Sequence, residues 1–325
     1  MIVNSTFFVT RKCNLNCSYC QVKNKKMSEL SISEKEDALL VMKKLGVGIN
    51  ILFGGEPLML GSGLVELVEF MNNNNIPYAI SSNSTKTLLD KFKQDLIDVG
   101  LKNWSVSLDT LKIDKNINKD IRKKSNEALD ALDWFKRNGV PDLHATITVT
   151  RKNIDEVKTI VSILSGMGIW SEVTPVHWSK GKLYDMFPVK NKVDYLQESD
   201  RPKIEKMTEA VKFKCKEFKI HNEPEIFDKW GKYAFDLSWR CKKFCLLVMD
   251  ADGSMRCCLH YKGKRSPKFN IFDLSNGNKL KSFIKAQRLD AKECSGCFWD
   301  CYWQAEYLSK NLTMAKKKFR HEVNL

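Results

Sequence analysis

The sequence predicts an α/β protein whose first half is an open barrel of strand–helix units. Short β-like runs alternate with amphipathic stretches from residue 5 to residue 176, the pattern of a parallel sheet covered by helices. Six such units are two fewer than the eight that close a complete barrel, so a partial barrel is expected. Ligands bind at the strand ends of such barrels, and the side chains singled out below fall at those ends.

The elements of the barrel follow one another in regular order. Ser33 and Glu36 have the spacing of a capping box and predict the start of the first helix, which Gly46 ends. The other predicted helices of the barrel cover 64–71, 88–99, a long stretch ending near 138–139, and 154–164. The six predicted strands are 5–10, 49–53, 78–81, 104–108, 143–150 and 172–176.

The second half has a different pattern. It begins with a helical, charged stretch and ends in a small cysteine-rich α+β region, where the Asp252-Gly253 turn predicts a hairpin. The predicted elements here are a helix at 202–218, strands at 246–249 and 255–258, and a final helix at 302–319. We therefore divide the chain into a partial barrel, a helical linker and a cysteine-rich domain, at 1–190, 191–237 and 238–325.

The composition restricts the compartment and the partners. The 325 residues carry 54 Lys+Arg against 39 Asp+Glu, a formal charge of +15, but the excess is scattered and has no interleaved aromatic side chains. It fits a solvated surface better than a nucleic-acid interface. No apolar run reaches the ~18 residues needed to cross a bilayer, and the amino terminus lacks the pattern of a signal peptide. We expect a cytoplasmic chain, in which 11 cysteines indicate metal binding rather than disulfides.

The first group of cysteines directly follows the first predicted strand. Cys13, Cys17 and Cys20 have the spacing C-x3-C-x2-C, which lets one loop hold three corners of a cubane [4Fe–4S] cluster. The fourth iron then has no protein ligand and is open to a substrate or cofactor, as in catalytic metal sites. A structural zinc loop is the alternative, but zinc in such sites takes four ligands and no fourth lies nearby.

This spacing, with the aromatic Tyr19 just before the third cysteine, resembles the signature of the radical S-adenosylmethionine (SAM) superfamily. The resemblance implies that SAM chelates the open iron, and that a flavodoxin- or ferredoxin-type donor supplies an electron. Reductive cleavage of SAM would then give methionine and a 5′-deoxyadenosyl radical, which abstracts a hydrogen atom from a substrate. In such enzymes the cofactor carries the difficult chemistry and the protein orients it.

Three further segments at strand ends resemble the SAM-binding segments of that superfamily. Gly54-Gly55-Glu56-Pro57 follows the second strand, and the resemblance assigns it to the SAM amino group. Glycines allow a close backbone approach, and a carboxylate pairs well with an ammonium group. Ser82-Asn83 and Ser107-Leu108-Asp109 would face the ribose and carboxylate of SAM. Relatives commonly carry glycine where this chain has Ser84, and strand-end capping is the alternative role of the other two serines.

The later cysteines form a second group. Together with Gly253 and Cys301 they resemble the auxiliary-cluster domains called SPASM and twitch, and the stretch 249–258 reads as the hairpin of such a domain. The resemblance implies at least one auxiliary [4Fe–4S] cluster, and we expect one rather than two because the later spacing is incomplete. A zinc site is the alternative, since a C-x2-C pair with two distant cysteines is also a zinc pattern. The expected ligands are Cys241, Cys258, Cys294 and Cys297.

Four cysteines remain outside both sets. Each is explained by default as a small buried apolar side chain. The sharper hypothesis is that one of them donates a hydrogen atom to a substrate radical, which would suit an epimerase. These candidate hydrogen-atom donors are Cys215, Cys245, Cys257 and Cys301.

The substrate class rests on the resemblance. Relatives with auxiliary-cluster domains modify peptides and proteins, while others act on nucleotides and aminocyclitols. We expect a peptide or protein substrate; because no peptide-binding segment precedes the first strand, a separate recognition protein or a small-molecule substrate stays open. The ending Glu-Val-Asn-Leu, in place of Gly-Gly, disfavours the molybdopterin-pathway group. The alternative from another class is a non-catalytic iron–sulfur or zinc protein that binds nucleic acid, and the three-ligand motif argues against it.

Overall fold

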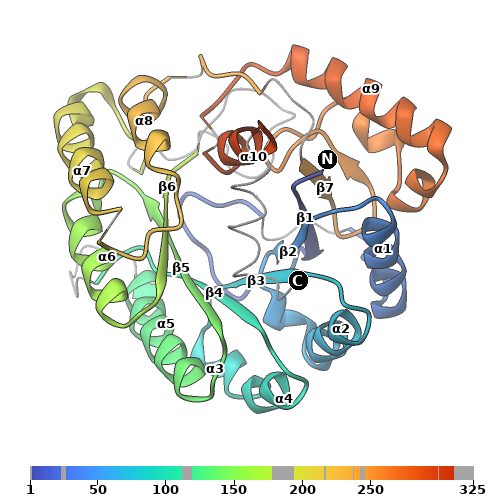
Figure 1. Ribbon diagram of the computed structural model, residues 1–325, viewed down its shortest axis with the longest axis horizontal. Helices are drawn as coiled ribbons and strands as arrows, with labels where there is room; N and C mark the ends of the chain where they lie inside the picture. Colours follow the sequence, from blue (N-terminus) through green and yellow to red (C-terminus); the bar gives the residue numbers. More distant parts are fainter. Residues whose placement is uncertain are drawn as a thin grey trace.

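A curved, mostly parallel sheet runs through the computed structural model and confirms the partial barrel (Figure 1). The structure describes residues 2–22, 27–111, 119–177, 194–215, 217–236, 238–241, 246–298 and 300–310. Within these ranges eight strands join in the order β6-β5-β4-β3-β2-β1-β7-β8, and only β7 and β8 pair antiparallel. They are β1 (Asn4–Thr10), β2 (Ile49–Gly54), β3 (Tyr78–Ser82), β4 (Asn103–Ser107), β5 (Asp142–Val149), β6 (Trp170–Pro175), β7 (Leu246–Met249) and β8 (Met255–Arg256).

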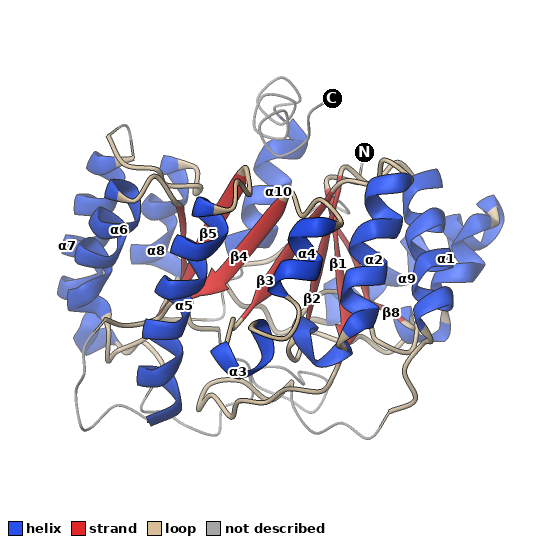
Figure 2. Ribbon diagram, turned by 90° about the horizontal axis from the view of Figure 1, so that it is seen from below, coloured by secondary structure: helices blue, strands red, loops and turns tan. Residues whose placement is uncertain are grey.

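Helices cover the outer face of this sheet, as Figure 2 shows from the side. The exception is α10, which lies at the open side of the barrel between β6 and β7 (Figure 1). In the described part of the chain, no helix has the length and apolar character of a membrane-spanning segment. The helices are α1 (Ile32–Lys44), α2 (Ser62–Asn73), α3 (Lys86–Leu89), α4 (Lys93–Asp98), α5 (Lys119–Arg137), α6 (Val157–Gly166), α7 (Arg201–Lys214), α8 (Phe227–Tyr233), α9 (Gly277–Glu293) and α10 (Asp300–Lys310).

The predicted capping box of the first helix was wrong by two residues. The Ser31 side chain accepts from the Glu34 N–H at 3.2 Å, and Glu34 accepts from the Ser31 N–H at 2.7 Å. The pair Ser33 and Glu36 has the same spacing, so the local pattern does not choose between them. Tertiary packing does, because an earlier start brings Ile32 against Gly63 at the beginning of α2.

Two other helix boundaries differ from the sequence prediction. The helix expected over 88–99 is two short helices, α3 and α4, because Phe92 between them has a non-helical φ of −132°. The helix expected over 202–218 starts at Arg201 and ends at Lys214. Only the part of the last predicted helix up to Lys310 lies within the described residues.

The carboxy-terminal hairpin extends the barrel sheet. Strand β7 pairs in parallel with β1, with Phe7 opposite Met249, on the edge of β1 that β2 leaves open. The second strand of the hairpin ends at Arg256, two residues earlier than predicted. Cys257 and Cys258 therefore lie just beyond the ladder, where loop backbone can place a thiol away from the sheet.

Candidate functional site

The loop after β1 carries the first group of cysteines at the carboxyl end of the strand. Cys13, Cys17 and Cys20 are all partly exposed. The Leu15 N–H contacts the Cys13 sulfur at 3.4 Å, and the Cys20 N–H donates to the Cys17 carbonyl at 3.1 Å, which closes a turn. Backbone N–H groups that point at sulfur are a common feature of iron–sulfur sites, where they tune the reduction potential.

The Gly-Gly-Glu-Pro segment packs its backbone against the start of this loop. The Gly55 N–H donates to the Thr10 carbonyl and the Glu56 N–H to the Lys12 carbonyl, each at 2.8 Å. A Cβ atom at Gly54 would lie 2.2 Å from the Thr10 carbonyl oxygen, and one at Gly55 would lie 2.0 Å from that of Lys12. Both glycines are therefore required by close contacts with the backbone of the segment just before Cys13.

The Glu56 side chain ties the end of β2 to the end of β3. Its buried carboxylate accepts from the Leu58 N–H at 3.0 Å, from the Ser82 hydroxyl at 2.7 Å and from the Asn83 N–H at 2.7 Å. Pro57 opens the short 3-10 helix that brings the Leu58 N–H into place. The group that the resemblance assigns to the SAM amino group thus also has a structural role.

A chain of side-chain amides joins the end of β3 to the cysteine loop. The Asn83 amide donates to Asn14 at 2.9 Å, and the Asn14 amide donates to Thr85 at 2.7 Å. Ser84 adopts a φ of 53°, the left-handed conformation that glycine adopts most readily, and accepts from the Trp104 indole at 3.0 Å. Sequence reasoning missed Asn14; its position inside the C-x3-C spacing was the available signal.

The end of β4 is joined to the cysteine loop through Tyr19. The Tyr19 hydroxyl donates to Asp109 at 2.7 Å, and the other Asp109 oxygen accepts from the Thr148 N–H at 3.1 Å. Burial, followed by the Asp109 charge, raises the pKa of Tyr19 well above its usual value, so the phenol stays a donor. Ser107, the last residue of β4, is partly exposed at the same edge.

The structure brings four of the later cysteines together. Burial, followed by the nearby Cys297 and Cys258 and then by Glu306 and Cys294, raises the pKa of Cys241 well above its usual value. The Tyr261 N–H contacts the Cys258 sulfur at 3.0 Å, and the Gly296 N–H contacts the Cys294 sulfur at 3.3 Å. These four, which are the residues predicted as auxiliary ligands, line one pocket together with Cys257, Trp239 and Tyr302: Cys241, Cys258, Cys294 and Cys297.

This donor set fits an iron–sulfur cluster. Neighbouring buried thiols resist ionisation, and a metal centre supplies the positive charge that makes them thiolates. Four sulfur donors are the set that iron–sulfur clusters and zinc take. Among the described residues, no three His, Cys, Asp or Glu side chains converge on the position of one metal ion. A cubane, in contrast, takes each thiolate on a different iron.

Of the remaining cysteines, Cys257 also lines this pocket, whereas Cys215 is not among its lining residues. The Cys257 sulfur lies 3.7 Å from the Gln287 carbonyl in a buried position, which fits a small apolar side chain. Cys215 lies at the end of α7, where burial and two nearby glutamates raise its pKa to about 11. Cys245 and the side chain of Cys301 lie outside the described residues.

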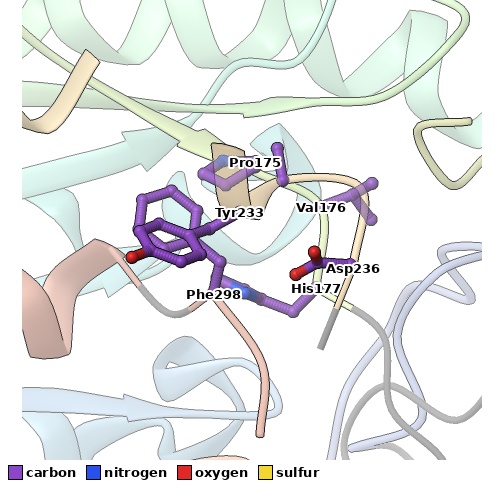
Figure 3. A pocket seen from close by; sticks show the side chains of 7 residues that line it. Pro175, Val176, His177, Tyr233, Asp236 and Phe298 are labelled. Atoms are coloured by element: carbon purple, nitrogen blue, oxygen red, sulfur yellow. The ribbon is translucent and has the colours of Figure 1, made fainter. Parts of the chain in front are cut away.

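A small pocket lies between the end of β6 and the segment that follows Cys297. Figure 3 shows the His177 ring and the Asp236 carboxylate on one side and two aromatic rings on the other. Burial, followed by the charge of His260, lowers the pKa of His177 to about 3, so its imidazole is neutral. No Lys or Arg side chain is among the described lining residues, which are Pro175, Val176, His177, Tyr233, Ala234, Asp236 and Phe298.

Fold and donor sets together define an α/β partial-barrel protein built around thiol-rich metal sites. Residues 7–164 match the family model of the radical SAM superfamily, and the chain belongs to that superfamily. It is therefore an enzyme that uses a [4Fe–4S] cluster and SAM, as the cysteine spacing predicted.

Two relatives with curated names differ in how much of their length aligns with this chain. The uncharacterized protein MJ0907 of Methanocaldococcus jannaschii is 31% identical over 173 residues, which are 50% of this chain and 58% of that protein. The GTP 3′,8-cyclase of Alkaliphilus metalliredigens is 24% identical over 294 residues, 84% of this chain and 88% of that enzyme. The chain thus spans less than two thirds of the first relative and most of the second.

Solved structures of low sequence identity share the fold. The anSMEcpe structure with bound AdoMet and the Cp18Cys peptide has a TM-score of 0.62 at 17% identity, covering 97% of this chain and 99% of that one. Streptococcus suis SuiB bound to its precursor peptide SuiA has a TM-score of 0.64 at 15% identity, covering 87% and 64%. The likeness to anSMEcpe extends over the cysteine-rich end of the chain as well as the barrel.

Proposed function

We propose that this enzyme oxidatively modifies a peptide or protein side chain with the help of one auxiliary [4Fe–4S] cluster. The observation that carries the proposal is the grouping of Cys241, Cys258, Cys294 and Cys297 around one pocket. Four protein thiols complete a four-iron cluster, so this second cluster has no open iron to bind a substrate. It is suited instead to accept an electron from the substrate.

The first cluster would be held by Cys13, Cys17 and Cys20. With SAM bound, it supplies the reductive cleavage that yields a radical able to take a hydrogen atom from the substrate. The protein's part is to fix this loop: the Gly-Gly backbone holds its start, and Asn83 and Asp109 hold its interior through Asn14 and Tyr19. The residues we propose for SAM contacts are Tyr19, Gly54, Gly55, Glu56, Pro57, Ser82, Asn83, Ser107 and Asp109.

The electron count supports an oxidation. Cleavage of SAM consumes one electron from an external donor of flavodoxin or ferredoxin type. Loss of a hydrogen atom leaves the substrate one electron short of its starting state, and transfer of a second electron to the auxiliary cluster, with loss of a proton, completes a two-electron oxidation. A closed auxiliary cluster is the acceptor that such a step needs.

The described lining of the pocket at the end of β6 is compatible with a peptide side chain. A triphosphate is held by cations and N–H donors. The described lining instead offers aromatic rings, a neutral His177 and the acidic Asp236. The peptide-bound structures of SuiB and anSMEcpe, which share this fold, are consistent with such a substrate. This proposal also includes a separate recognition protein, a cytoplasmic location, and the division of the chain into three parts after residues 190 and 237.

A second candidate is a reaction on a nucleotide. It is favoured by the curated relatives named GTP 3′,8-cyclase, one of which aligns with 84% of this chain. The two candidates differ in what GTP does to the reconstituted enzyme.

The test is 5′-deoxyadenosine production by the anaerobically reconstituted protein with dithionite and SAM. Cys17→Ala should abolish production, and Glu66→Gln, at an exposed position on α2, should preserve it. GTP should neither stimulate production nor be consumed. Consumption of GTP in step with 5′-deoxyadenosine would refute the peptide proposal in favour of the nucleotide reaction.

A further inference from the structure

A buried cluster of charges connects the two cysteine sites. Arg11, which directly follows β1, donates to Asp250 through Nε at 2.6 Å and through Nη2 at 2.5 Å. Arg256 in β8 donates to the same carboxylate through Nη1 at 2.8 Å. All three residues are at most 1% exposed.

This cluster places two cations around one anion. Two guanidinium groups share one carboxylate, and their central carbons lie 3.9 and 5.5 Å from the centre of the Phe8 ring. Burial alone would raise the pKa of Asp250, but hydrogen bonding and charge from Arg11 and the charge of Arg256 hold it below its usual value. The carboxylate is therefore ionised, and both guanidinium groups are held against it in a buried position.

The Arg256 side chain lies beside the auxiliary cysteines. Arg256 precedes Cys258 by two residues, and its side chain contacts the Cys258 and Leu259 carbonyls at 3.4 Å each. On the other side, Arg11 precedes Cys13 by two residues.

We propose that Arg256 is a positioning residue of the auxiliary site, which fixes the Cys258 turn and raises the reduction potential of the cluster held there. The inference rests on the proposed auxiliary cluster. Reduction adds a negative charge to the cluster, and a nearby buried cation stabilises that charge with little screening. Asp250, which Arg11 also binds, anchors the Arg256 guanidinium beside the Cys258 turn.

The experiment is an electron paramagnetic resonance redox titration of the full chain. A Cys17→Ala parent lacks the first cluster, so the auxiliary signal is measured alone. Arg256→Met removes the charge but leaves the neutral Arg11–Asp250 pair, which protects the fold. Arg256→Lys keeps a charge, and Arg288→Met removes one from an exposed position on α9 as the matched control.

In the parent chain carrying Arg256→Met, the equilibrium constant for reduction should fall about tenfold, or 59 mV for a one-electron couple. Arg256→Lys and Arg288→Met should stay within about threefold of the parent. An unchanged reduction potential in Arg256→Met overturns this inference and leaves the proposed function unaffected. If Arg256→Met takes up no iron while Arg256→Lys does, the positive charge is needed to hold the thiolates, and the inference is supported. If neither variant takes up iron, the inference is overturned. Absence of any cluster in the parent overturns the auxiliary site together with this inference.

Discussion

Replacement of Glu56 by glutamine separates its role within the protein from a role in binding SAM. The carboxylate accepts three hydrogen bonds from the Leu58 N–H, the Ser82 hydroxyl and the Asn83 N–H. Glutamine has the same shape and keeps one oxygen for the first two donors, but its amide nitrogen would face the Asn83 N–H. Hydrogen bonds to charged groups contribute about 1.5–3 kcal/mol, so the free energy of unfolding should fall by about 2–3 kcal/mol.

The assay is anaerobic urea unfolding followed by tryptophan fluorescence, with SAM affinity measured in parallel by calorimetry. Glu66→Gln, at an exposed position on α2, is the matched control and should leave both quantities unchanged. If Glu56→Gln unfolds at the urea concentration of the parent while SAM affinity falls tenfold or more, the carboxylate serves SAM and the structural argument is wrong.

Three further predictions follow from the site. Gly55→Ala, whose Cβ would lie 2.0 Å from the Lys12 carbonyl oxygen, should lower the free energy of unfolding by about 1–3 kcal/mol and reduce iron at the first site; normal iron content would contradict this. Cys294→Ser should remove about half of the iron per chain and Cys257→Ser none, as measured by iron and sulfide analysis. Burial lowers the pKa of His177 to about 3 in the folded protein from its usual 6.5, so the unfolded chain binds the extra proton. The free energy of unfolding therefore falls as the pH drops below 6.5. Between pH 6.5 and 5 the parent should lose about 1.5 kcal/mol more than His177→Gln in urea unfolding, and equal losses would refute this.

The strands were predictable because β-like runs and strand-end motifs are local patterns. Strand β3 was predicted as 78–81 and extends to Ser82, and β2 was predicted as 49–53 and extends to Gly54. The capping box was not predictable, because two Ser-x-x-Glu pairs lie two residues apart and both satisfy the same local pattern. Only the contact of Ile32 with Gly63 distinguishes them, and that contact depends on the position of α2.

The candidate site was predictable in its residue types more than in its contacts. Cysteine spacing pointed to Cys13, Cys17 and Cys20 and to the superfamily to which the chain belongs. The amide chain through Asn14 could not be read from spacing, because its partner Asn83 comes from another strand end. The contact of the Gly-Gly pair with the backbone of Thr10 and Lys12 could not be predicted either, because it joins segments that are far apart in the sequence.

The pairing of β7 with β1 also has a consequence for the order of folding. Strand β1 leaves the ribosome long before Leu246, which pairs with Asn4. Until then one edge of β1 has unsatisfied backbone groups, the kind of edge through which chains associate wrongly. Loops that close over such separations form slowly, so we expect the nascent barrel to depend on protection of this edge. A chain interrupted before the hairpin would retain the first cysteine motif on a strand that lacks its neighbour.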